Sequence, residues 1–92
     1  MRMRKMKNLD SRMERCAALR VAEPARLRGN WRSLKPDAAQ LWVEVGCGKG
    51  KFTAETAAAN PDVLMIAVER CREAMVVAME KAQSMNLTNV FY

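Results

Sequence analysis

The stretch Leu41 to Gly50, LWVEVGCGKG, decides the fold of this 92-residue chain. Its first half is a run of β-favouring residues, and glycines alternate with other residues in its second half. This pattern predicts a strand, buried on both faces of a parallel sheet, that turns sharply into a helix. Helix-forming residues follow from Lys51 to Ala59, and Asn60 and Pro61 end that helix. A second apolar run, Val63 to Val68, predicts another buried strand.

The C-terminal third of the chain continues the alternation of strand and helix. Arg72 to Met85 predicts an amphipathic helix whose core-facing residues are spaced by three and four: Met75, Met79, Ala82 and Met85. Asn89 to Tyr92 starts a third strand. The order β-α-β-α-β predicts an α/β fold, the N-terminal half of a doubly wound parallel sheet. Because three such strands would leave both edges of the sheet unpaired, we expect the chain to be part of a larger domain.

The charge divides the chain into two parts. Residues 1–35 hold eleven Lys or Arg and three acids, a net charge of +8, whereas residues 36–92 carry −2. We therefore expect a basic N-terminal extension over residues 1–36 and a domain over residues 37–92. A cationic arm of this kind favours a polyanion as partner, although a merely solubilising tail has the same composition. Trp31, between two arginines, is interpreted as a packing anchor, with stacking on a base as the alternative.

Composition excludes several classes of protein. Apolar residues make up 50% of the chain and charged residues 28%, as in globular proteins. The longest uncharged apolar run, Val63 to Val68, is far shorter than a membrane-spanning helix requires. Three widely spaced cysteines without any histidine indicate neither a disulfide framework nor a zinc site, and we expect no metal. The basic N-terminus lacks the apolar segment of a secretory signal, which predicts a soluble, cytoplasmic protein.

The glycine loop fits one of three known binding patterns best. A phosphate-binding P-loop needs GxxxxGK followed by Ser or Thr, which no register supplies. The dinucleotide fingerprint GxGxxG matches only in part, because the third glycine, Gly50, comes one place early. An acid two residues before GxGxG remains: Glu44 precedes Gly46 and Gly48. This pattern resembles that of S-adenosylmethionine-dependent methyltransferases with a Rossmann-like sheet.

The chemistry of that cofactor accounts for the residues. Glu44 would favour the cationic ammonium and sulfonium side, while glycine amides at the helix start would receive the cofactor carboxylate. Glu69, 25 residues after Glu44 and directly after the second strand, would accept the two ribose hydroxyls. Cys47 is interpreted as a packing residue, because the sequence places no base beside it.

Nearly the whole chain resembles the N-terminal part of bacterial tRNA (guanine-N7-)-methyltransferases. The resemblance is carried by the opening MRMRK, the GNWRSL stretch, the LWVEVGCGKGKF loop, NPD, the VLMIAVER strand and the closing NLTNV. It implies transfer of the S-adenosylmethionine methyl group to N7 of a guanine in tRNA, with tRNA as the partner of the basic extension. The cofactor-binding residues of that family carry over onto Glu44, Gly46, Gly48 and Glu69.

The resemblance implies no catalytic residue in this chain. In the family, an aspartate near the reacting purine lies after the third strand, so we expect these 92 residues to be inactive alone. Two alternatives stay open: a non-catalytic RNA-binding module, and a fragment of a nicotinamide-dependent oxidoreductase. The sequence carries no signal for the oligomeric state.

Overall fold

A three-stranded parallel sheet organises the computed structural model, which describes residues 6–92. Its strands are β1 (Gln40–Val45), β2 (Val63–Val68) and β3 (Val90–Phe91), in the spatial order β1-β2-β3. β1 and β2 pair along their full length, with Glu44 opposite Ala67. The predicted alternation of strand and helix and the α/β fold class are confirmed.

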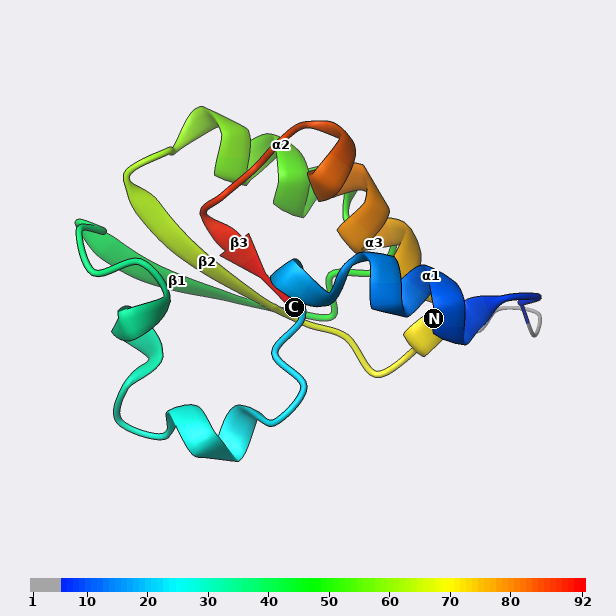
Figure 1. The fold of residues 1–92 in the computed structure, drawn as a ribbon. Helices are drawn as coiled ribbons and strands as arrows, with labels where there is room; N and C mark the ends of the chain where they lie inside the picture. Colours follow the sequence, from blue (N-terminus) through cyan, green and yellow to red (C-terminus); the bar gives the residue numbers. More distant parts are fainter. Residues whose placement is uncertain (1–5) are drawn as a thin grey trace.

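Two helices cover one face of this sheet (Figure 1). α2 (Lys51–Ala59) connects β1 to β2, and α3 (Arg72–Ser84) connects β2 to β3. Every second residue of β2 belongs to the core beneath these helices, because side chains alternate between the two faces of a strand. These β2 residues, Val63, Met65 and Ala67, cluster with Ala57 of α2 and with Val76, Ala78, Met79 and Ala82 of α3.

The N-terminal segment wraps around the sheet rather than forming a core of its own. It contains α1 (Leu9–Arg15) and three short 3-10 helices, Ala17–Leu19, Pro24–Leu27 and Trp31–Leu34. α1 lies beside α3, and the chain then passes across the sheet face that α2 and α3 leave open (Figure 1). Three side chains of this segment reach the core: Met13, Cys16 and Leu19. Most of the basic leader in residues 1–7, including Arg2, Arg4 and Lys5, lies outside the described residues.

The same segment covers the free edge of β3. The amide of Tyr92 donates to the carbonyl of Leu19 at 2.8 Å, and the amide of Val21 donates to the carbonyl of Tyr92. The expectation that both edges of the sheet are unpaired is therefore wrong on the β3 side. Residues 19–21 serve there as the hydrogen-bonding partner that a fourth strand would otherwise supply.

Two predictions about burial are wrong. β1 is not buried on both faces, since Val43 is 59% and Val45 81% exposed. β1 pairs only with β2 among the described residues, and the N-terminal segment covers the second face loosely. Met85 is 37% exposed rather than part of the core, because α3 ends at Ser84 and Asn86 takes a left-handed conformation with φ 56°.

None of the helices between residues 6 and 92 is both long enough and apolar enough to cross a bilayer.

Candidate functional site

The loop between β1 and α2 turns back onto the end of β2. Gly46, Gly48 and Gly50 all have positive φ values, 77°, 58° and 82°, which glycine adopts without the steric cost of a Cβ. The amides of Gly46 and Cys47 both donate to the carbonyl of Val68, at 2.7 and 3.2 Å. The sharp turn that the glycine spacing predicts therefore exists, and hydrogen bonds hold it at the carboxyl edge of the sheet.

Gly50, the residue directly before α2, also has a steric role. A Cβ built on Gly50 would lie 2.5 Å from Cβ and 2.8 Å from Cα of Ala78 in α3. Real Cβ atoms do not approach other atoms so closely. The third glycine of the loop therefore lets α2 and α3 pack in direct contact, whereas a Cβ on Gly46 would meet open space.

Glu69 lies at the end of β2 and is held by the backbone on both sides. Its Oε1 accepts the amide of Gly48 at 2.7 Å, and its Oε2 accepts the amide of Cys71 at 2.9 Å. The bonds from Cys71 and Gly48 lower the pKa of the Glu69 carboxyl, because they stabilise its charged form. At neutral pH Glu69 is an ionised acceptor, and each oxygen keeps a free lone pair for a further donor.

Glu44 lies at the end of β1 on the sheet face that α2 covers. Its Oε1 accepts the hydroxyl of Thr53, a fully buried residue in the first turn of α2. Glu44 itself is only partly buried. A strand-end carboxylate embedded in apolar sequence thus has a partner, which avoids the cost of burying an unpaired charge. Sequence reasoning gave no role to Thr53.

Cys47 lies within electrostatic range of both acids. Burial, reinforced by the charges of Glu69 and Glu44, raises the pKa of the Cys47 thiol to about 11. The thiol is therefore protonated at neutral pH, and a protonated thiol is a poor nucleophile. This agrees with the interpretation of Cys47 as a packing residue in the turn.

A hollow of about 450 Å³ opens between the second face of the sheet and the N-terminal segment. Its walls are mostly apolar, and Glu69 is the carboxylate among them. Other residues in its walls include Trp31, Val43, Ile66, Met75 and Tyr92. A volume of this size is within the usual range for sites that take a nucleoside-sized ligand.

The four predicted site residues differ in their relation to this hollow. Glu69 lines it, whereas Glu44 is not among its wall residues and points instead to Thr53. The amides of Gly46 and Gly48 bond to groups of the chain itself. The structure thus brings both acids to one loop, around Cys47, but brings only one of them to the hollow.

Tyr92 is a wall residue that sequence reasoning missed. It is 5% exposed, and within the described part of the chain its buried hydroxyl has no hydrogen-bond partner. Burial, with smaller effects of Cys47 and Glu44, raises the pKa of this phenol. The pairing of β3 with β2 and with residues 19–21 places Tyr92 here, so no local sequence signal could reveal it.

The arrangement offers hydrogen-bond acceptance and apolar contact. Residues 6–92 contain no group of three His, Cys, Asp or Glu side chains that could hold a metal ion. An ionised carboxylate at one end of an apolar hollow can bind hydroxyl groups while the walls contact an aromatic ring or a thioether.

Comparison with known proteins identifies the family to which the chain belongs. The family described as "Putative methyltransferase" matches residues 38–92. A tRNA (guanine-N(7)-)-methyltransferase of Acetivibrio thermocellus is 36% identical over 84 residues, which cover 91% of this chain and 38% of the relative. Enzymes of the same name from Halalkalibacterium halodurans and Bacillus licheniformis are 39% and 32% identical, over 76% and 98% of this chain. The chain spans between 32% and 42% of the length of these three relatives.

Proposed function

Because the chain belongs to the methyltransferase family that matches residues 38–92, we propose that its hollow and glycine loop bind S-adenosylmethionine. Glu69 carries this proposal, since it joins the glycine loop to the end of β2 and also lines the hollow. Its free lone pairs suit the two ribose hydroxyls of the cofactor, and the apolar walls suit the adenine ring and the methionine chain. The residues present therefore fit the group.

Each predicted site residue has a defined part in this proposal. Glu69 accepts the ribose hydroxyls. Glu44, oriented by Thr53, supplies negative charge beside the loop and favours the cationic end of the cofactor. Gly46 and Gly48 shape the turn so that a ligand can approach the backbone without meeting a Cβ. The bound cofactor would supply a methyl group attached to a positively charged sulfur.

For the acceptor, we propose N7 of a guanine in tRNA. The relatives named tRNA (guanine-N(7)-)-methyltransferase support this substrate, and so does the net charge of +8 in residues 1–35. Guanine N7 has a free lone pair and needs no prior loss of a proton, so positioning contributes most of the rate. Such a reaction needs no nucleophilic side chain, which agrees with the protonated thiol of Cys47.

Calorimetric titration of the 92-residue chain with S-adenosylhomocysteine and, separately, with NAD tests the cofactor. We expect heat from the first ligand and none from the second. Heat from NAD alone would instead favour an oxidoreductase and end the methyltransferase proposal. Absence of heat from both ligands, in a chain with a folded circular dichroism spectrum, would leave an RNA-binding module as the better description.

Titration with a tRNA transcript at several salt concentrations tests the second substrate. Each phosphate that the chain neutralises releases counterions, so the affinity should fall steeply with salt. Removing residues 1–7 takes away four cations and should flatten that dependence. An unaltered dependence of affinity on salt would show that residues 1–7 do not contact the tRNA backbone.

A further inference from the structure

Two contacts attach the cationic N-terminal segment to the rest of the protein: the short helix α1 beside α3, and the pairing of residues 19–21 with the end of β3. α1 has seven residues, and a helix of this length is unstable in water unless other parts of the chain hold it. Cations that surround it are exposed to solvent: Lys7, Arg15 and Arg20. The positions of Lys7 and Arg15 therefore depend on how α1 is fixed to α3, whereas Arg20 lies between two residues that bond to Tyr92.

Apolar contacts account for only part of that attachment. Met13 and Cys16 are almost completely buried and belong to the core beside Met79 of α3. Apolar packing of this kind is not directional, so it leaves the precise position of a short helix along its neighbour weakly defined. Polar contacts must supply the missing specificity.

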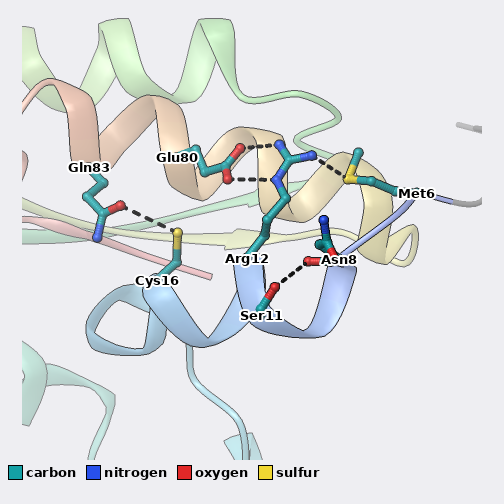
Figure 2. Close-up of polar contacts among 7 residues, drawn as sticks. All are labelled: Met6, Asn8, Ser11, Arg12, Cys16, Glu80 and Gln83. Atoms are coloured by element: carbon teal, nitrogen blue, oxygen red, sulfur yellow. Dashed lines mark hydrogen bonds and ion pairs between the residues drawn. The ribbon is translucent and has the colours of Figure 1, made fainter.

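Arg12 and Glu80 form the directional contact (Figure 2). Nε of Arg12 donates to Oε2 of Glu80 at 2.8 Å, and the terminal NH2 group donates to Oε1, so the two side chains meet as a two-bond fork. Both are sheltered, with 27% and 33% of their side-chain surfaces exposed. The third guanidinium nitrogen, Nη1, donates to the sulfur of Met6. A fork of this geometry fixes orientation as well as distance.

Further bonds attach α1 at the ends of the interface, among them one from the thiol of Cys16 to Oε1 of Gln83. The side chain of Gln83 donates to the carbonyl of Arg15 at 2.9 Å near the C-terminal end of α3. Arg72, in the first turn of α3, pairs with Asp10 at 2.9 Å. This pair is largely exposed, so it contributes little to stability. It does show that α1 lies beside the turn of α3 that follows Glu69.

We propose that the Arg12–Glu80 pair is a positioning device that holds the cationic N-terminal segment in register on α3, so that an RNA backbone bound there lies at a fixed place relative to the Glu69 site. α3 connects the two regions, because its preceding residue, Cys71, bonds to Glu69 and its middle residue, Glu80, bonds to Arg12. This inference rests on the proposed function, and it assigns to Arg12 and Glu80 no contact with cofactor or guanine.

The substitution Glu80→Gln gives a test in which the direction of the change in tRNA affinity separates two explanations. It raises the net charge by one unit, so charge alone predicts tighter binding of a tRNA transcript. Loss of the pair predicts the opposite, because only the fraction of molecules with α1 in place binds well. We expect binding about twofold to fivefold weaker, the range for losing a partly exposed ion pair.

Glu55→Gln is the matched control. Glu55 is exposed on α2, and no hydrogen bond or ion pair of its side chain is found within residues 6–92. The change in charge is identical, so this variant should bind tRNA as well as the parent or slightly better. S-adenosylhomocysteine binding should be unchanged in both variants. Weakening by Glu80→Gln with no weakening by Glu55→Gln would support the proposal, whereas equal or tighter binding by Glu80→Gln would overturn it.

The exchange variant R12E/E80R keeps the proposal testable if Glu80→Gln alone unfolds. It restores an opposite-charge pair at the parental net charge, and we expect tRNA affinity within about twofold of the parent, because the pair again holds α1. Weak tRNA binding despite intact S-adenosylhomocysteine binding would show that Arg12 itself contacts RNA, and would refute the positioning role. Failure of the parent chain to bind either ligand would count against the proposed function instead.

Discussion

The carboxylate of Glu69 accepts the backbone amide of Gly48 at 2.7 Å, which ties the end of β2 to the glycine loop that follows β1. Its second oxygen accepts the amide of Cys71 at the start of α3. One side chain thus joins three backbone segments at the carboxyl edge of the sheet, where ligands bind in open α/β folds. Substitution of Glu69 should therefore change both the affinity for the ligand and the stability of the glycine loop.

Glu69→Ala should weaken the binding of S-adenosylhomocysteine by about 1 to 3 kcal/mol, because the ligand loses hydrogen bonds to a charged acceptor. Calorimetry of the parent and the variant measures the difference. Glu55→Ala, which removes an exposed acid on α2, is the control and should leave the affinity unchanged. An unchanged dissociation constant for Glu69→Ala would refute the ribose-binding role.

The same backbone bonds predict a dependence of stability on pH. Because they lower the pKa of Glu69 in the folded chain, the charged form is favoured there relative to the unfolded chain. The resulting stabilisation is fully present above the ordinary carboxyl pKa of about 4.3 and is lost as the pH falls through the lowered native pKa. Urea unfolding at pH 7 and pH 3 should show a smaller acid-induced loss of stability for Glu69→Gln than for the parent.

Glu80 provides an internal comparison for this prediction. Its pKa is also lowered, by its hydrogen bond from Arg12, so part of the acid-induced loss should persist in Glu69→Gln. The variant in which both acids are replaced by glutamine should lose less still. An acid-induced loss identical in the parent and in Glu69→Gln would contradict the native bonds of Glu69.

The elements that could be predicted from sequence are those that depend on local pattern. Lys51–Ala59 and Val63–Val68 occur with the predicted bounds, because Asn60 and Pro61 end the helix and the apolar run has no break. The turn at the glycine loop was also predictable, since three glycines after a β-favouring run leave few alternatives.

The features that could not be predicted depend on contacts between distant residues. Arg12 and Glu80 are 68 residues apart. Nothing in the sequence distinguishes Arg12 among sixteen basic residues or Glu80 among ten acidic ones. The cover of the β3 edge likewise joins residues 19–21 to Tyr92, about 70 positions later in the chain. Glu44 lies outside the hollow because its side chain is on the sheet face that α2 covers, where it accepts the hydroxyl of Thr53 in the first turn of α2.

Gly50→Ala should destabilise the chain more than Gly46→Ala. Both positions have positive φ, which costs a residue with a Cβ about 1 to 2 kcal/mol. At Gly50 the new Cβ also meets the backbone and side chain of Ala78, and such overpacking costs about 1 to 3 kcal/mol more. Urea unfolding of the two variants measures the difference. Equal losses would show that α2 and α3 separate at no cost.

Tyr92→Phe should leave the free energy of unfolding unchanged or raise it by up to about 1 kcal/mol. The hydroxyl is buried without a partner among residues 6–92, so removing it takes away a desolvated polar group and no hydrogen bond. Tyr92→Ala should instead lower the free energy of unfolding by about 3 to 5 kcal/mol, because the ring is buried in the core cluster with residues of β2, α3 and the N-terminal segment. Urea unfolding at pH 7 measures both. A loss of more than 1 kcal/mol for Tyr92→Phe would mean that the hydroxyl has a partner in solution.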